Sequence, residues 1–291
     1  MVNKSKEQLQ VSETSIWGYV IPNNWLSPVE VEYLKNLPEN LPSMDWVCDE
    51  LDRIWKDMKL DNHIALRQQP IGAYYGHPVW LMNGLFSVCD PISFSHRVAI
   101  AKYLGDSGVK LVADYGGGFG QLALCIATEI QDAEIYIVEP YPSKVGIERL
   151  RGETRIKIVS NLTVDKYEAI VAQDVLEHVE DPIQLAYEIA SSIRIVGKVI
   201  FANCFFPVIQ SHLPSTFHLR HTFPYVMKSL GLRFVGTLNG AEHAQIFERV
   251  GVLSLPKARK AEAISKLIGP LLNQGSKLFA TVKSSVKLLV K

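Results

Sequence analysis

The chain has 291 residues, of which 47% are hydrophobic and 21% are charged, as is usual for a globular protein of one large or two modest domains. This composition excludes a mainly disordered chain, a collagen-like repeat and a small disulfide scaffold. Basic and acidic residues number 30 each, so the whole chain lacks the basic excess of a nucleic-acid-binding protein, and no nucleic-acid partner is expected.

The charge is unevenly distributed along the chain. The last 35 residues, Lys257 to Lys291, hold eight basic residues and one acidic residue, so this tail carries +7 and the remainder carries −7. An acidic body with a basic tail indicates that the two parts contact different partners or surfaces.

The cysteines and the N-terminus indicate the compartment. Cys48, Cys89, Cys125 and Cys204 show no C-x-x-C spacing, which favours free thiols in a reducing compartment over a zinc site or a disulfide framework. The polar N-terminus shows no secretory signal, and no run of about 18 apolar residues predicts a membrane-spanning helix. We therefore expect a cytoplasmic protein.

The first 105 residues are predicted to form a mainly helical region. A serine followed by a proline predicts a helix that starts at Ser27. Apolar residues at helical spacing predict a second helix over Asp45–Leu60. The segment Ile71–Asp90, rich in glycine and aromatic residues, is expected to be irregular but buried, and Pro91–Leu104 is expected to be helical.

From Val109 onward, short runs rich in valine and isoleucine alternate with amphipathic stretches. This alternation predicts an α/β domain with a parallel sheet that is covered by helices on both faces. The later runs LRFVGTL and AQIFERVGVL are joined through Asn239 and Gly240. They predict an antiparallel hairpin at one edge of the sheet.

A glycine-rich turn follows the first strand of this domain. The strand ends at Asp114, and Gly116, Gly117, Gly118 and Gly120 lead into a helix. Such a turn lets a ligand approach the backbone and the N–H groups at the start of the helix. The run GFGQLA also fits a dinucleotide-binding pattern, and a turn that only packs a helix on a sheet is the structural alternative.

The next strand, EIYIV, ends before Glu139, about 20 residues after the glycines. An acid at this place can accept hydrogen bonds from two ribose hydroxyls. A surface acid at the end of a strand is the alternative.

The run AQDVLEHVEDP, which contains Asp174, Glu177 and His178, follows the strand YEAIV. Together with DYGGGFG upstream, it resembles the class I S-adenosylmethionine-dependent methyltransferase family over about residues 109–250. The run DVLEHVEDP is common among members that act on small molecules and sugars. The resemblance implies a Rossmann-like sheet of seven strands with a reversed last strand, and S-adenosylmethionine as the cofactor.

The resemblance also implies positions around the cofactor. The loop Asp114–Gly120 would face the methionine part, Glu139 the ribose hydroxyls, and Asn161 and Leu162 the adenine. The residues Asp174, Val175 and Leu176 would line the cofactor from the fourth strand. The family frequently has an acid where this chain has Asn161. Arg97, in the helix before the first strand, could bind the cofactor carboxylate through its guanidinium fork, and a solvated arginine is the alternative.

Histidines are the candidate acceptor-side groups. His178 either orders the loop after its strand or transfers a proton. His212, His218 and His221 lie within ten residues, and His218 or His221 is our candidate general base, with His212 as a substrate contact. Imidazoles also bind metals, but no aspartate or cysteine accompanies these three, so no metal site is predicted. Packing of the loop is the remaining alternative.

Two further segments have open interpretations. Tyr74, Tyr75 and His77 suit the wall or lid of an acceptor pocket, or else a buried aromatic staple between the two regions. After Pro256, apolar residues recur at helical spacing, with breaks at Gly269–Pro270 and Gly275. Lysines recur on the opposite side of the predicted helix. This basic amphipathic tail could bind an anionic membrane surface or a partner's groove, or pack on its own domain or on a second subunit of an oligomer.

The sequence therefore predicts a helical lid or substrate region over 1–105, a cofactor-binding domain over 106–255 and a tail over 256–291. The predicted function is S-adenosylmethionine-dependent O-methylation of a small molecule or a glycan precursor, as in polysaccharide biosynthesis. The alternatives are a nucleotide-dependent oxidoreductase, which the GFGQLA run motivates, and a non-catalytic cofactor-binding subunit that docks a partner through its tail.

Overall fold

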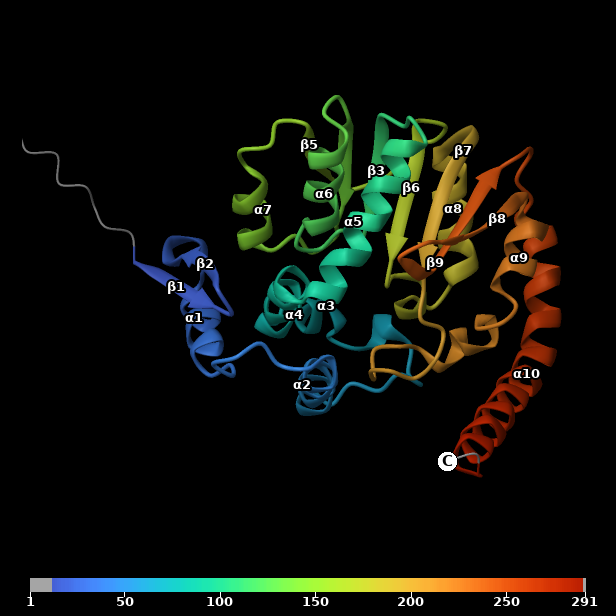
Figure 1. Ribbon diagram of the computed structural model, residues 1–291, viewed down its shortest axis with the longest axis horizontal. Helices are drawn as coiled ribbons and strands as arrows, with labels where there is room; N and C mark the ends of the chain where they lie inside the picture. The colour runs from blue at the N-terminus through green and yellow to red at the C-terminus, as the bar shows by residue number, and fades with distance from the viewer. Residues whose placement is uncertain (1–11, 290–291) are drawn as a thin grey trace, which may run out of the picture.

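The computed structural model describes the backbone of residues 12–289 and the side chains of residues 12–275. A seven-stranded sheet in the order β5-β4-β3-β6-β7-β9-β8 forms its centre (Figure 1). The strands are β3 (Leu111–Tyr115), β4 (Glu134–Val138), β5 (Ile156–Val159), β6 (Tyr167–Gln173), β7 (Ile193–Ala202), β8 (Leu232–Leu238) and β9 (Ala241–Arg249).

The sheet is mixed. Strands β3 to β7 are parallel to one another, whereas β9 pairs antiparallel with both β7 and β8. The predicted parallel sheet and the terminal hairpin are confirmed. The hairpin's second strand, β9, is inserted between β7 and β8, so that β8 is the edge strand.

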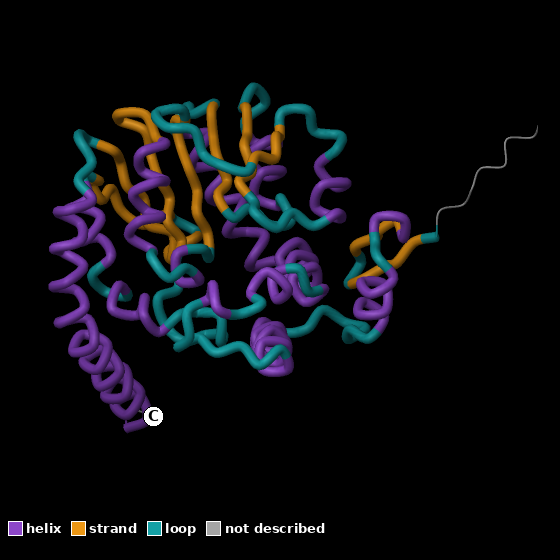
Figure 2. The backbone as a smooth tube through the Cα atoms, turned by 180° about the vertical axis from the view of Figure 1, so that it is seen from behind, coloured by secondary structure: helices purple, strands orange, loops and turns teal. Residues whose placement is uncertain are grey.

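Helices cover both faces of the sheet, as the alternation of strands and helices predicts. Helices α5 (Pro91–Asp106) and α6 (Gln121–Glu129) pack on one face, and α8 (Pro182–Ser192) and α9 (Phe223–Leu230) pack on the other; α7 (Lys144–Leu150) follows β4 (Figures 1 and 2). Along β3, Val112 joins the first cluster and Ala113 the second. Because both faces are buried there, the central strands β3, β4 and β6 are mostly apolar.

Residues 12–90 contain a hairpin and four α-helices, which precede α5. Their bounds are β1 (Glu13–Ile16), β2 (Tyr19–Pro22), α1 (Pro28–Lys35), α2 (Met44–Asp57), α3 (Ile71–Tyr75) and α4 (Pro78–Cys89). Short 3-10 helices span Asn23–Trp25, Leu66–Gln68, Leu176–His178 and Pro214–Leu219. The predicted start of α1 is confirmed, since Ser27 accepts a hydrogen bond from the backbone N–H of Glu30. The β1–β2 hairpin was not predicted from the sequence.

The expectation of an irregular segment over 71–90 is wrong, because this segment forms α3 and α4. Helix α4 lies between two apolar clusters: Met82 and Phe86 pack into one of them, and Leu81 and Leu85 into the other. A helix that is apolar on all sides shows no amphipathic periodicity in its sequence. That explains why the helix was missed.

The N-terminal helices lie across the edge at which the parallel strands end (Figure 1). The Trp80 ring contacts the His178 ring edge to face, with centroids 6.4 Å apart. The Leu66 N–H donates a 2.6 Å hydrogen bond to Glu180. This region therefore forms a wall above the carboxyl edge of the sheet, where ligands bind in open α/β folds.

The C-terminal helix α10 (Leu255–Leu289) is continuous, so the predicted breaks at Gly269–Pro270 and Gly275 are wrong. A proline inside a helix removes one backbone hydrogen bond, and here the helix continues beyond it. Ala258 and Ala261 are buried in the same cluster as α8 and α9, and the Ser265 hydroxyl bonds to the His218 carbonyl at 3.0 Å. The beginning of the tail therefore packs on its own domain.

Two further sequence expectations concern the whole chain. All four cysteines carry free thiols, as predicted. Within the described residues, no helix is both long enough and apolar enough to cross a membrane.

Gly269 fits α10 closely against the domain, because a β-carbon there would lie 2.5 Å from the His218 carbonyl oxygen. Gly269→Ala should therefore lower the free energy of unfolding by about 1–3 kcal/mol, the usual cost of overpacking. Gly275→Ala is the matched control, because a β-carbon there meets no atom within 4 Å. Urea unfolding of both variants makes the comparison, and equal effects would contradict the packing of α10.

Candidate site at the carboxyl edge of the sheet

The glycine loop between β3 and α6 requires glycine for two reasons. Gly116, Gly118 and Gly120 have φ angles of +72°, +48° and +76°. This left-handed backbone region is unfavourable for residues that have a β-carbon. A β-carbon at Gly116 would also lie 2.6 Å from the Val175 side chain, and one at Gly120 would lie 2.8 Å from Leu150. The loop can therefore fold closely against the ends of the neighbouring elements.

Asp114 lies at the bottom of this loop with 2% of its surface exposed. Its Oδ2 atom has no hydrogen-bond partner, and a β-carbon at Gly117 would approach that atom to 2.7 Å. Burial raises the pKa of Asp114 to about 7, against the opposing charge of Arg97. A buried oxygen without a partner marks a place where a bound ligand can complete the hydrogen bonding.

Arg97 reaches this side of the site from α5. Its guanidinium donates a 2.8 Å hydrogen bond to the Ser93 carbonyl, and its charge acts on Asp114. The structure thus brings the Arg97 charge within electrostatic range of Asp114, and the predicted contact with the cofactor stays a prediction.

Glu139 is fixed to the other side of the loop. Its carboxylate accepts hydrogen bonds from the Gly118 N–H at 2.9 Å and from the Tyr141 N–H at 3.0 Å. A carboxylate has about four acceptor positions, so these two bonds leave capacity for ligand hydroxyls. The Tyr141 ring stacks on Tyr75 of α3 at a centroid distance of 5.8 Å.

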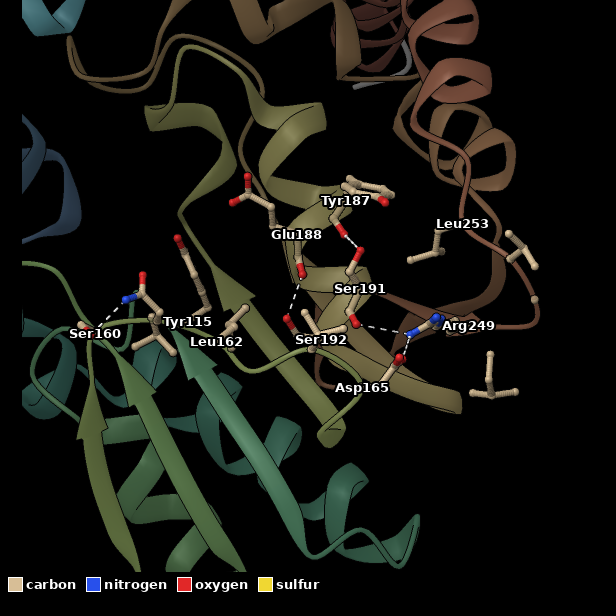
Figure 3. A pocket seen from close by; sticks show the side chains of 16 residues that line it. Tyr115, Ser160, Leu162, Asp165, Tyr187, Glu188, Ser191, Ser192, Arg249 and Leu253 are labelled. Atoms are coloured by element: carbon tan, nitrogen blue, oxygen red, sulfur yellow. Dashed lines mark hydrogen bonds and ion pairs between the residues drawn. The ribbon is translucent and has the colours of Figure 1, made fainter.

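The predicted adenine positions lie beyond β5. Asn161 is exposed, and its amide donates a 3.1 Å hydrogen bond to the Ser160 hydroxyl. Asn161 and Leu162 line a cavity of about 640 Å³ that extends along α8 from Tyr115 to Arg249 (Figure 3). Only the Tyr115 end of this cavity adjoins the glycine loop.

The segment after β6 supplies the third side of the site. Asp174 has a φ of +54°, and its N–H donates a 2.7 Å hydrogen bond to the Ala202 carbonyl at the end of β7. Val175 contacts the glycine loop at Gly116. The structure therefore places Val175 beside the loop, directly after the exposed Asp174, and the contact of both residues with a cofactor stays a prediction.

Glu177, His178 and His212 form a compact cluster, in which the potential ligand atoms lie within 4.8 Å of one another. Burial raises the pKa of Glu177, and the charge of Asp174 adds to this effect. Burial lowers the pKa of His178 to about 3. Burial also lowers the pKa of His212, against the opposing hydrogen bonds to the backbone of Phe206 and Cys204.

A second, smaller cavity of about 200 Å³ opens beyond the end of β7. His221 lines it together with His243, and the buried side-chain oxygens of Asn203 and Gln245 in its wall have no hydrogen-bond partner. The His243 ring lies 4.8 Å from the His96 ring of α5. The sequence singled out His221 and the segment that begins at Asn203, whereas His243 and Gln245 were missed because no local motif marks them.

His218 points away from this edge. It is buried against α10, where its Nε2 atom lies 3.8 Å from the Glu262 carboxylate. The 3-10 helix Pro214–Leu219 turns this side chain toward α10. This position contradicts the prediction of His218 as a general base.

Of the three predicted lid residues, Tyr75 alone faces the site. Its ring stacks on Tyr141, whose N–H donates to Glu139, and it also contacts the Trp80 ring at 5.1 Å. Tyr74 is fully buried and contacts the Trp55 ring at 5.1 Å, so it fits the aromatic staple instead. His77 caps α4 by accepting a 3.0 Å hydrogen bond from the Val79 N–H, away from the glycine loop.

The buried Asp114 makes stability depend on pH. Its pKa is raised in the folded state, to about 7 from an unfolded value near 4, so the folded state retains a proton that the unfolded chain releases. Wild-type stability should therefore fall relative to Asp114→Asn as the pH rises from about 4 to 7, by about 2–4 kcal/mol. Urea unfolding of both proteins across this range measures the difference, and a constant difference would contradict the assignment.

Comparisons with known proteins give the fold. No family model and no curated relative matches the chain. Human N-acetylserotonin methyltransferase in complex with S-adenosylmethionine superposes with a TM-score of 0.50 at 16% identity, over 77% of this chain and 70% of that one.

Two further solved structures are similar. A putative O-methyltransferase from Nostoc punctiforme gives a TM-score of 0.49 at 14% identity and covers 74% of each chain. The mitomycin 7-O-methyltransferase MmcR gives 0.48 at 16% identity, over 71% of this chain and 67% of that one. The chain has the α/β fold seen in S-adenosylmethionine-dependent methyltransferases.

Proposed function

We propose that this protein is an S-adenosylmethionine-dependent methyltransferase that modifies a hydroxyl group of a small molecule or glycan precursor. One observation carries the proposal. On a methyltransferase-like fold, the carboxyl edge of the sheet gathers a glycine loop, an acid fixed to that loop and a buried acid with an unpaired oxygen.

The residues at this edge fit the parts of the cofactor. Glu139 has acceptor positions for the two ribose hydroxyls. Asp114 and Arg97 offer opposite charges, and thus suit the amino and carboxylate groups of the methionine part. Asn161 and Leu162 are assigned to the adenine, and Val175 to the wall beside the glycine loop.

S-adenosylmethionine supplies an activated methyl group on a sulfonium. The protein must align the acceptor, exclude water and accept the proton of a hydroxyl acceptor. Tyr75 and Trp80 reach the site from the N-terminal helices and provide a neutral aromatic cover. Burial and the charge of Arg220 lower the pKa of His221, so this imidazole is neutral near pH 7 and able to accept a proton.

The smaller cavity supports a polyhydroxylated acceptor. Its unpaired Asn203 and Gln245 oxygens can only accept hydrogen bonds, so they suit hydroxyl donors such as those of a sugar. The cavity also contains the aromatic walls of Phe201, Phe205 and Phe206. A sugar presents both hydroxyls and apolar C–H surfaces, and this wall matches both.

Binding of S-adenosylhomocysteine, measured by titration calorimetry, tests the cofactor class. Glu139→Gln should weaken binding by about 1–3 kcal/mol, the cost of an unpaired ribose contact. Glu39→Gln removes an exposed acid in the N-terminal region and should leave the affinity unchanged. Binding of NADH in place of S-adenosylhomocysteine would instead support the oxidoreductase alternative. Failure of the folded wild-type protein to bind S-adenosylhomocysteine would contradict the proposal.

We also propose that α10 attaches the protein to an anionic membrane surface. Leu267 and Leu271 lie one helical turn apart and are 75% and 67% exposed, on a helix whose sequence is rich in lysine. Exposed apolar side chains beside basic ones favour binding at an anionic interface. Such attachment would bring the enzyme to a lipid-linked or surface-polysaccharide precursor.

Sedimentation with phosphatidylglycerol vesicles tests this attachment. The double variant Leu267→Glu/Leu271→Glu should reduce the fraction of protein bound to vesicles by more than half, because it places negative charge among the exposed apolar side chains of α10. Its free energy of unfolding should stay near the wild-type value, since both side chains are exposed. Phosphatidylcholine vesicles are the uncharged control. Absence of wild-type binding to the anionic vesicles would exclude the attachment.

A further inference from the structure

We propose that Glu177, His178 and His212 bind a divalent first-row transition-metal ion beside the acceptor cavity. The sequence analysis predicted no metal site, because it considered His212 with His218 and His221. The structure groups His212 with Glu177 and His178 instead. The proposed binding stands on this geometry alone, whereas the ion's role in the reaction rests on the proposed methyltransferase function.

The three side chains are close enough to share an ion. One potential ligand atom from each lies within 4.8 Å of the other two. Ligand atoms about 2.1 Å from a common ion lie up to about 4.2 Å apart. Small side-chain rotations would therefore complete the coordination.

A backbone carbonyl fixes the orientation of each imidazole. The Nδ1 atom of His178 lies 3.0 Å from the Ser211 carbonyl oxygen, and that of His212 lies 2.9 Å from the Phe206 carbonyl oxygen. Because a carbonyl only accepts, Nδ1 carries the proton and Nε2 carries the lone pair. Histidines that bind metals are commonly oriented through such a hydrogen bond on the other ring nitrogen.

Glu177 supplies an independent indication of a ligand. Its side chain is 0% exposed, and Oε1 accepts a 2.6 Å hydrogen bond from the Cys204 N–H. The other oxygen, Oε2, is buried and has no hydrogen-bond partner among the residues that the structure describes. A buried carboxylate oxygen left unpaired is costly, and a cation at the cluster would satisfy it.

The donor set defines the class of ion. Two imidazoles and one carboxylate suit Zn²⁺, Co²⁺, Mn²⁺ or Fe²⁺, whereas Mg²⁺ and Ca²⁺ prefer sites made of oxygen ligands. Three protein ligands also leave at least one coordination position open, as in catalytic zinc sites.

The cluster adjoins the acceptor side of the site. Phe206, whose carbonyl orients His212, also lines the smaller cavity, and Asn203 in the cavity wall directly precedes Cys204, which bonds to Glu177. An ion at the cluster could bind an acceptor hydroxyl in its open position and lower the pKa of that hydroxyl. The proton released from that hydroxyl would then pass to water, so that no dedicated histidine base is needed.

Cobalt titration of the EDTA-treated full-length protein tests the site. Calorimetry should show one Co²⁺ per chain, with a visible absorption band from the bound ion. Glu177→Gln and His212→Gln should each weaken Co²⁺ binding at least about tenfold, since even the loss of a residue that only hydrogen-bonds to a metal ligand usually costs that much affinity. His63→Ala removes an exposed histidine of the N-terminal region and is the control. S-adenosylhomocysteine affinity and thermal unfolding verify that each variant is folded.

Absence of Co²⁺ and Zn²⁺ binding by the wild-type protein would overturn the metal site, whatever the variants show. Binding that persists unchanged in both folded variants would overturn it as well. A protein that binds S-adenosylhomocysteine but no metal keeps the proposed function and loses the metal site. A protein that binds metal through these residues but not S-adenosylhomocysteine keeps the site and loses the function.

Discussion

The close approach of the glycine loop to its neighbours is the constraint on which the rest of the site depends. A β-carbon at Gly116 would overlap Val175, and the Gly118 N–H donates to Glu139. These contacts join the ends of β3, β4 and β6 at one edge of the sheet. Because the loop carries so few side chains, its backbone is open to a ligand at the point where three strand ends meet.

The same edge concentrates polar groups that are poorly satisfied. Among the described residues, one carboxylate oxygen of Asp114 and one of Glu177 are buried without a hydrogen-bond partner. The side-chain amide oxygens of Asn203 and Gln245 are also buried without a hydrogen-bond partner. Unpaired buried groups reduce stability, and proteins retain them mainly at functional sites. They fall into two groups, one around Asp114, where the proposed function places the cofactor, and one around Glu177 and the smaller cavity, where it places the acceptor.

Local sequence signals predicted the parts of the fold and site that depend on local chemistry: the cap of α1, the glycine loop and the β8–β9 hairpin. The missed features depend on tertiary packing. Gln245 reaches the site because β9 pairs with β7 in a register that puts Gln245 opposite Phe201. The spacing of residues along the chain does not reveal this register. Similarly, the spacing of His212 and His218 could not show that one faces Glu177 and the other faces Glu262. Helix α4 was missed because it has no polar face.

A crystal structure of the protein grown with S-adenosylhomocysteine tests the central claim most directly. We expect the ribose hydroxyls to bind Glu139, the homocysteine end to lie at the glycine loop near Asp114, and the sulfur to face the side on which Glu177 and the smaller cavity lie. A ligand bound instead wholly within the cavity along α8, with the glycine loop empty, would contradict the account.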